Sequence, residues 1–201
     1  FIPANLLGVI EKYKLTTFCA PPTMYRFMLQ KKVEDYDLSS VEQWCTAGEA
    51  LNPEVFDRWE ELTGRKIASG FGQTEGTVLI ACFEWFEAKP GTLGKPSPIY
   101  DLHLLNDKGE DCENGEEGEI VICGLDQNPP VGLFVGYYKD EEMTKEALGS
   151  GSYNLKDVAW RDNMGYHWFV GRHDDVIKCS GYRIGRLEVE SALVEHRAVV
   201  E

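Results

Sequence analysis

Residues 165–185 have the sequence GYHWFVGRHDDVIKCSGYRIG. Two short apolar segments, His167–Val170 and Val176–Cys179, are typical of strands, and a charged turn separates them. The glycines on either side allow the backbone to turn tightly or to approach a ligand closely. So many polar residues between apolar strands are more than a purely structural hairpin needs. The stretch therefore predicts a β-rich end to the chain and a binding role for its turns.

Upstream of this stretch, residues 1 to about 70 alternate between helix and strand patterns. Apolar strands are predicted at 15–20, 41–47 and 65–69, and helices at about 22–33 and after Asn52. Asn52-Pro53-Glu54 is a strong helix start, with a cap residue, a proline at the first helical position and an acid in the first turn. Gly64 is expected to end that helix. This alternation predicts an α/β fold, a parallel sheet flanked by helices.

Past Gly91 the pattern changes to short strands, among them 119–123, with turns rich in Gly, Asp, Asn and Glu. One helix, at about 140–148 and capped by Asp140, interrupts them. We expect an α/β part over residues 1–90 and a small β-barrel-like subdomain over residues 91–172. Residues 173–201 are expected to form a hinge and the start of a small α+β domain.

Composition excludes several classes of function. The chain has 201 residues, of which 43% are hydrophobic, and a formal net charge of −14. Such an acidic protein has no general attraction to nucleic acid or anionic lipid, and its apolar runs are too short for membrane insertion. Six scattered cysteines without a CxxC pair favour free thiols, and with no visible signal peptide they predict a cytoplasmic protein. The first residue is not Met and the last residues are apolar, so we expect a fragment of a longer protein.

The segment Gly70–Gly76, GFGQTEG, carries groups suited to a phosphate and Mg²⁺. We expect a strand to end here and the backbone to bend tightly. Thr74 then offers a hydroxyl and Glu75 a carboxylate at the carboxyl edge of a parallel sheet, where α/β proteins bind ligands. Taken alone, so short a segment is better explained as a solvated turn with an incidental Glu. The loop Gly48-Glu49-Ala50 offers a flat backbone for a planar ring, or is a plain strand-to-helix loop.

Further polar residues lie towards the end of the chain. Asp157 could accept hydrogen bonds from ribose hydroxyls and Arg172 could clamp a sugar or phosphate, or the two could form a surface ion pair. Asp174 is a turn acid. Ser180-Gly181-Tyr182-Arg183 could serve a phosphate or a pantetheine arm, or belong to a simple hairpin. The four histidines have no metal-ligand spacing and are interpreted as structural or surface residues: His103, His167, His173 and His196.

These segments, in this order and over nearly the whole chain, resemble the AMP-forming acyl-CoA synthetases of the adenylating superfamily. The likeness is greatest to the medium-chain branch, and it includes Val131–Tyr138, VGLFVGYY. The resemblance implies an AMP-forming acid–thiol ligase that uses ATP, Mg²⁺, CoA and a medium-chain or branched carboxylic acid. It implies that residues 1–90 are the last part of the large α/β subdomain.

The resemblance also implies roles for individual residues. Thr74 contacts the α-phosphate and Glu75 holds Mg²⁺, which makes these two the catalytic pair. Asp157 and Arg172 bind the ribose, Asp174 is the domain hinge, and Ser180, Gly181, Tyr182 and Arg183 contact CoA. Gly72 leaves room in the acyl pocket. The remaining ATP- and AMP-binding residues are Gly48, Glu49, Ala50, Gly70, Phe71, Gly72 and Gln73.

One segment departs from the family pattern. Tyr153-Asn154-Leu155-Lys156-Asp157 has Leu-Lys where the family has Thr-Gly before the ribose-binding acid. This departure keeps open a non-catalytic nucleotide- or acyl-binding relative. A separate alternative within the superfamily is an adenylation domain that loads a carrier protein. The family's phosphate loop and its catalytic lysine are expected outside this chain, so the isolated chain is expected to be inactive. Acyl chain length and oligomeric state do not follow from the sequence.

Overall fold

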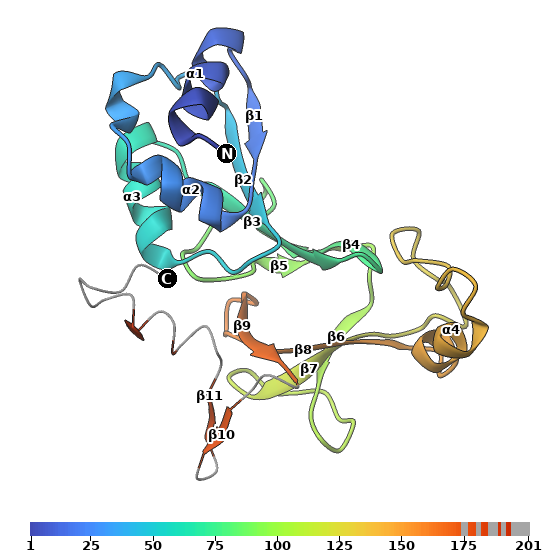
Figure 1. Cartoon of the computed structure of the whole chain (residues 1–201). Coiled ribbons are helices and arrows are strands. Elements are labelled where there is room, and N and C mark those ends of the chain that lie inside the picture. Colours follow the sequence, from blue (N-terminus) through green and yellow to red (C-terminus); the bar gives the residue numbers. More distant parts are fainter. Residues whose placement is uncertain (174–176, 180–181, 185–188, 190–191, 194–201) are drawn as a thin grey trace. The chain divides into compact units, whose positions relative to one another are not determined.

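A computed structural model describes residues 1–173, 177–179, 182–184, 189 and 192–193 (Figure 1). The chain divides into two compact units. The first unit comprises residues 1–72 and 80–94, and the second comprises residues 73–79 and 95–201. Each unit has its own secondary structure and its own buried residues, so each is described by itself.

The first unit contains parallel strands β1 (Thr17–Cys19), β2 (Gln43–Ala47) and β3 (Ile67–Gln73). Phe18 pairs with Trp44, and Trp44 pairs with Ile67, so these three apolar side chains share one face of the sheet. The last residues of β4 (Gly76–Ala81) also lie in this unit, where the Cys82 amide donates to the carbonyl of Ser69 at 2.8 Å. The predicted mixed α/β fold with its parallel strands is confirmed.

Three α-helices accompany these strands in the described part of the first unit: α1 (Pro3–Tyr13), α2 (Pro22–Leu29) and α3 (Pro53–Thr63). Each has a proline in its first turn, where a missing N–H costs nothing. The Asn52 side chain caps α3 by accepting from the Glu54 amide at 2.8 Å, and Gly64 ends it at φ 70°. The helix predicted over 22–33 ends at Leu29 instead. A 3₁₀ turn over Val33–Asp35 follows, which buries Val33.

The core of the first unit is strongly aromatic. The Trp59 ring lies edge to face against Tyr25 and Trp44, with centroid distances of 4.9 and 5.0 Å. Such pairs contribute about 0.5–1.5 kcal/mol each beyond the area they bury. Leu7 and Ile10 of α1 are also fully buried. Helix and strand residues thus enclose one continuous apolar cluster.

The second unit is built on the antiparallel sheet β6 (Leu102–Leu105), β7 (Glu117–Ile122), β8 (Tyr153–Arg161) and β9 (His167–Arg172), in that order. The unit also holds β5 (Lys95–Pro96), α4 (Glu141–Leu148) and the pair β10 (Ile177–Cys179) and β11 (Tyr182–Ile184). Within the described residues the four-stranded sheet ends at β6 and β9, so the barrel-like detail expected for residues 91–172 is not confirmed. The division into 1–90, 91–172 and 173–201 stays a prediction.

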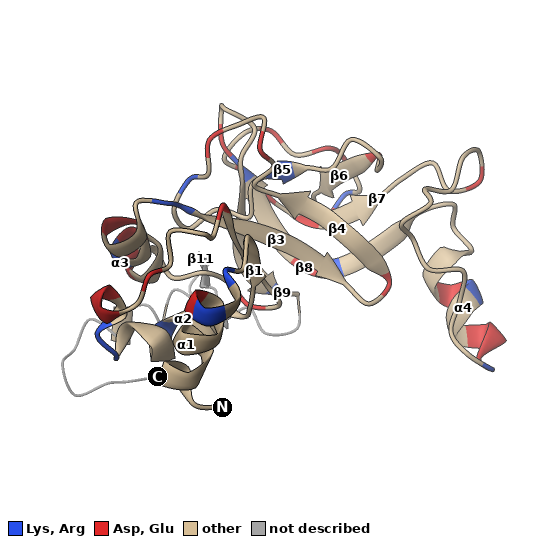
Figure 2. Cartoon of the chain, turned by 90° about the horizontal axis from the view of Figure 1, so that it is seen from above, with Lys and Arg blue, Asp and Glu red and all other residues tan. Residues whose placement is uncertain are grey.

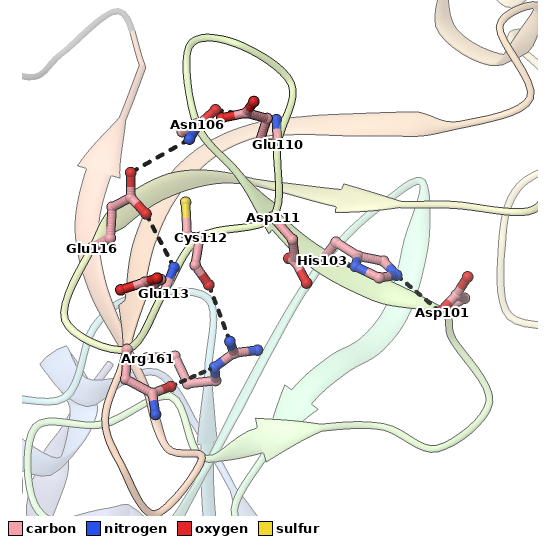
Figure 3. Close-up of polar contacts among 10 residues, drawn as sticks. Asp101, His103, Asn106, Glu110, Asp111, Cys112, Glu113, Glu116 and Arg161 are labelled. Atoms are coloured by element: carbon pink, nitrogen blue, oxygen red, sulfur yellow. Dashed lines mark hydrogen bonds and ion pairs between the residues drawn. The ribbon is translucent and has the colours of Figure 1, made fainter.

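Hydrogen bonds hold the turns around β6 and β7, as Figure 3 shows. The two ring nitrogens of His103 lie 3.1 Å from Asp101 and 3.4 Å from Asp111. Arg161 of β8 donates to the Cys112 carbonyl at 3.1 Å and to the Asn114 side chain. These contacts join neighbouring turns, which gives His103 the structural surface role that its spacing indicated.

In the part of the chain that the structure describes, acidic and basic residues are spread over many elements (Figure 2). Helix α4, for example, carries Glu141, Glu142 and Glu146 beside Lys145. Within the described residues, no helix combines the length and the apolar character that crossing a membrane requires.

Candidate functional site

The second unit contains a cavity of about 730 Å³. Four stretches of the sequence line it: Gln73–Glu75, Tyr137, the stretch from helix α4 to the first half of β8, and Arg172 at the end of β9. Four residues named from the sequence are among its lining: Gln73, Thr74, Glu75 and Arg172. The fold thus brings separate sequence motifs to one hollow.

Asp157 is the buried charge beside this cavity, with 3% of its surface exposed. It pairs across the sheet with Arg172, whose Nη1 lies 3.7 Å from Oδ1. Its Oδ2 accepts a hydrogen bond of 2.6 Å from Nε2 of Gln73. Burial raises the pKa of Asp157, and Arg172 and Gln73 oppose that shift by stabilising the charged form. This carboxylate is held in place by two partners on different strands.

A bulge in β8 places Asp157. Glu119 of β7 pairs with Val158, and Val121 pairs with Asn154, so three residues of β8 lie opposite one residue of β7. Such bulges bend a strand and change the direction of its side chains. Leu155 and Asp157 are both buried as a result, whereas Lys156 between them is exposed and lines the cavity.

Lys156 has φ 61°, in the left-handed region that favours glycine. Its amide donates to Oδ1 of Asn154 at 2.7 Å, and its carbonyl accepts from the His173 amide at 2.9 Å. Asn154 in turn donates to Glu119. These bonds support the bulge. A lysine thus occupies a backbone conformation that favours glycine, at the position where the family resemblance implied glycine.

Glu75 is the second residue of the hairpin turn and is half-buried. Its Oε1 accepts from the hydroxyl of Tyr137 at 3.0 Å, and its carbonyl accepts from the Phe134 amide at 2.7 Å. The bend expected over Gly70–Gly76 is shorter than predicted. Strand β3 continues to Gln73 and β4 begins at Gly76, because Gly70 still pairs with Ala47 in the sheet. The turn consists of Thr74 and Glu75, and Thr74 is exposed.

The other predicted nucleotide residues lie in the first unit. Gly48 has φ 92° in the loop after β2, and Glu49 accepts a hydrogen bond of 2.7 Å from Thr23. Gly70, Phe71 and Gly72 are part of β3, so they are extended rather than in a turn. Their roles towards adenine and the acyl group stay predictions.

Three of the remaining predicted residues lie outside the described part of the chain: Asp174, Ser180 and Gly181. Tyr182 and Arg183 belong to β11, where they pair with Cys179 and Lys178. The hinge and the CoA contacts stay predictions.

Two tyrosines of the site were not predicted from the sequence as functional residues. Tyr137 contacts Glu75, and the Tyr153 hydroxyl donates to Oε1 of Gln73 at 3.0 Å. Both lie in segments that carried the family resemblance, Val131–Tyr138 and Tyr153–Asp157, which was the signal that could have identified them.

The residues present could contribute to a Mg²⁺ site but do not form a complete one. Within the described residues, no group of three or more His, Cys, Asp or Glu side chains could hold a metal ion. Mg²⁺ in nucleotide sites is usually held by one or two carboxylates together with phosphate oxygens and water. Glu75, with one oxygen engaged by a tyrosine hydroxyl, fits that pattern as a single ligand.

Comparison with known proteins gives a consistent result. Residues 1–138 match the family described as AMP-binding enzyme. The chain is 40% identical over its full length to the mitochondrial acyl-coenzyme A synthetase ACSM3 of Mus musculus, and covers 34% of it. It is 43% identical over 196 residues to 4-hydroxybutyrate–CoA ligase 1 of Metallosphaera sedula, which is 97% of this chain and 34% of the relative. The chain thus spans about a third of the length of these relatives.

A solved structure also matches this chain. The anthranilate CoA ligase AuaEII, in complex with anthranoyl-AMP, superposes with a TM-score of 0.87 at 32% identity. The match covers 98% of this chain and 37% of that one.

Proposed function

Because the chain belongs to the AMP-binding enzyme family, we propose that the protein containing it is an AMP-forming acyl-CoA synthetase. In the first step a carboxylate oxygen of the acid attacks the α-phosphorus of ATP, and pyrophosphate leaves. The product is an acyl-adenylate. In the second step the thiolate of CoA attacks the acyl carbon, and AMP leaves with the electrons of the broken acyl–phosphate bond.

The observation that carries this proposal is the arrangement around Asp157. A buried carboxylate, held by Gln73 and paired with Arg172, adjoins a cavity that Thr74 and Glu75 also line. A carboxylate can accept bonds from two ribose hydroxyls, and an arginine can contact a sugar or a phosphate. Thr74 then donates to the α-phosphate.

Mg²⁺, when bound, would offset the negative charge that the phosphates carry and develop during adenylation. Glu75 is the residue of this chain that would hold it. Tyr137 donates a hydrogen bond to one carboxylate oxygen of Glu75, and the other oxygen would be the metal ligand.

Further assignments rest on the family resemblance alone. Phe71, with Gly48-Glu49-Ala50 and Gly70, would contact adenine, and Gly72 would leave space for the acyl chain. Asp174 would be the hinge, and Ser180-Gly181-Tyr182-Arg183 would contact CoA. The division at residues 90 and 172 belongs with these proposals.

The proposed substrate is a medium-chain or branched carboxylic acid. Relatives are named for other acids too, such as 4-hydroxybutyrate and anthranilate, so an acid series has to be tested.

The proposed compartment is a reducing one, since the five cysteines whose side chains are described are free thiols. The cytoplasm was expected from the sequence, whereas several relatives are named as mitochondrial. Fractionation of cells of the source organism separates the two.

The test is an assay of the full-length protein with ATP, Mg²⁺, CoA and acids from acetate to decanoate. We expect acid-dependent release of pyrophosphate and formation of the matching acyl-CoA, measured by mass spectrometry. Pyrophosphate release without acyl-CoA would favour the alternative of an adenylation domain that loads a carrier protein.

A non-catalytic nucleotide- or acyl-binding relative is the second candidate, because Lys156 occupies a left-handed conformation beside Asp157. In that case the same assay gives no pyrophosphate with any acid, while nucleotide or acid binding is retained in calorimetry.

A further inference from the structure

Two tyrosines of the second unit belong to two hydrogen-bond arrangements, one around Glu75 and one around Asp157. Tyr137 donates to Oε1 of Glu75 at 3.0 Å, and Tyr153 donates to Oε1 of Gln73 at 3.0 Å. Gln73 then donates to Asp157 at 2.6 Å and to the Leu155 carbonyl at 2.8 Å. Each carboxylate is therefore held by a donor that comes from a different part of the unit.

Packing restricts where the two hydroxyls can lie. The Phe134 ring lies 4.9 Å from the Tyr137 ring and 5.5 Å from the Tyr153 ring, between centroids. The Tyr137 amide donates to Oγ1 of Thr144 in α4 at 2.8 Å. A Cβ at Gly136 would come within 2.8 Å of that threonine, so the chain approaches α4 closely here. The tyrosines thus have little freedom to leave their partners.

The surroundings of both tyrosines raise the pKa of their hydroxyls. Burial raises the pKa of Tyr137, and its hydrogen bond with Glu75 and the charge of Glu75 raise the pKa further. Burial also raises the pKa of Tyr153, with the charge of Glu75, the neighbouring Tyr137 and the charge of Asp157 adding to the effect, whereas Tyr153 opposes the rise in the pKa of Tyr137. Both hydroxyls keep their proton at neutral pH and can donate it to their partners.

We propose that Tyr137 and Tyr153 are positioning residues: Tyr137 orients Glu75 towards the metal–phosphate end of the nucleotide, and Tyr153 orients Asp157 through Gln73 towards the ribose. The inference rests on the proposed function and deepens it, because it assigns two further residues to the same site. Neither tyrosine is expected to touch a reacting atom.

A neighbouring tyrosine provides a matched control. Tyr138 follows Tyr137 directly in the sequence, but its side chain is 88% exposed. Its ring contacts Lys139, with a distance of 5.2 Å from Nζ to the ring centroid, and this contact does not need the hydroxyl. Tyr138→Phe removes the same oxygen from the same segment without touching Glu75.

The first experiment tests Tyr137 in the full-length protein. Tyr137→Phe keeps the ring against Phe134 and removes only the donor to Glu75. We expect the Mg²⁺ concentration that gives half-maximal ATP binding in calorimetry to rise about tenfold, the loss typical of one hydrogen bond to a charged group. AMP binding without metal should be unchanged, and Tyr138→Phe should behave like the wild type.

A double-mutant cycle separates positioning from general support of the fold. If Tyr137 acts through Glu75, Tyr137→Phe should have no further effect on the Mg²⁺ requirement in a Glu75→Ala background. An equal effect in both backgrounds would overturn the assignment of Tyr137, and so would a wild-type Mg²⁺ requirement in the single variant.

The second experiment tests Tyr153 with AMP alone. Tyr153→Phe frees the Gln73 amide to turn, so the Kd for AMP should rise about five- to tenfold while the Mg²⁺ requirement stays the same. Unchanged AMP affinity would overturn this half of the proposal. Thermal unfolding of each variant checks that the fold is intact.

Failure of the positioning roles of Tyr137 and Tyr153 is distinguishable from failure of the proposed function. If the function is wrong, the wild-type protein itself shows no acid-dependent pyrophosphate release. If only the positioning roles are wrong, the wild type is active, and Tyr137→Phe and Tyr153→Phe behave like Tyr138→Phe.

Discussion

The backbone conformation of Lys156 affects the direction in which the neighbouring Asp157 side chain points. The Lys156 φ of 61° lies where a side chain crowds the following carbonyl, and the bulge that creates this angle also aims Asp157 inward. Asn154 and His173 hold the bulge through backbone hydrogen bonds. The residue before Asp157 therefore combines a conformational cost with a cation at the cavity.

Replacement of Lys156 separates these two effects. Lys156→Gly should raise the free energy of unfolding by about 0.5–1 kcal/mol, because glycine has no penalty at positive φ. It should also tighten ATP binding. Lys156→Ala removes the charge but keeps the Cβ, so it should not gain the stability. Urea unfolding and ATP calorimetry measure both quantities, and equal stability of the glycine and alanine variants would contradict the conformational argument.

Leu155 should not be restored to threonine at the same time. Its side chain is 1% exposed, so the exchange would replace buried apolar atoms with a hydroxyl. A double variant would mix that cost with the gain at Lys156.

Gly72 offers a residue-scale test of the acyl pocket. It lies on β3 and is exposed, so a large side chain can be accommodated there without opening the core. If the acyl chain passes this position, Gly72→Trp should shift activity from medium-chain acids to acetate or propionate by shortening the pocket. Relative kcat/KM values over an acid series measure the shift, and an unchanged chain-length profile would count against the assignment.

At the scale of the elements, strands β3 and β8 carry most of the proposed site, and the end of each is specified by its neighbours. β3 runs through the glycines to Gln73 because sheet pairing outweighs their turn preference. The bulge in β8 results from pairing with β7. The cavity residues on β3, β8 and β9 therefore occupy positions set by strand register, whereas Thr74 and Glu75 lie in the turn between β3 and β4.

Helix α3 provides an element-scale prediction, because one side chain caps it and its buried face lies in the aromatic core. Asn52→Ala removes the acceptor of the Glu54 amide and should lower the free energy of unfolding by about 1 kcal/mol. Asn52→Asp retains an acceptor and should cost little. Tryptophan fluorescence during urea unfolding includes the signals of Trp44 and Trp59 in this core, together with those of Trp160 and Trp168 in the second unit.

At the scale of the whole molecule, the chain is acidic and one buried histidine adds a specific sensitivity to acid. His167 in β9 is 2% exposed, and burial lowers its pKa from 6.5 to about 4. The histidine is therefore neutral in the folded state over a range in which the unfolded chain takes up a proton.

The sign of the pH dependence follows from that difference. The stabilising contribution of neutral His167 is fully present above pH 6.5 and is lost as the pH falls towards about 4. The loss should approach about 3 kcal/mol, since each unit of pKa difference corresponds to about 1.4 kcal/mol. A His167→Gln variant should show a flatter dependence of unfolding free energy between these pH values. The same slope in variant and wild type would show that another group is responsible. The raised pKa of Asp157 changes the unfolding free energy in the opposite direction as the pH falls, because protonation removes the cost of burying its charge.

The sequence by itself determined the local features of this protein. Strand and helix patterns, the cap at Asn52, the stop at Gly64 and the chemical types of Thr74, Glu75, Asp157 and Arg172 follow from short segments, because backbone preference and side-chain chemistry are local properties. The family resemblance followed from the order of those segments.

Only the tertiary structure decided which of these side chains meet. Gln73 reaches Asp157 across 84 positions of sequence, and Tyr137 reaches Glu75 across 62. Such contacts depend on strand register, on the bulge at Lys156 and on packing around Phe134, which no short window of sequence specifies. For the same reason the two tyrosines emerged as site residues only from the structure, since their role lies in the partner that folding brings within hydrogen-bonding distance.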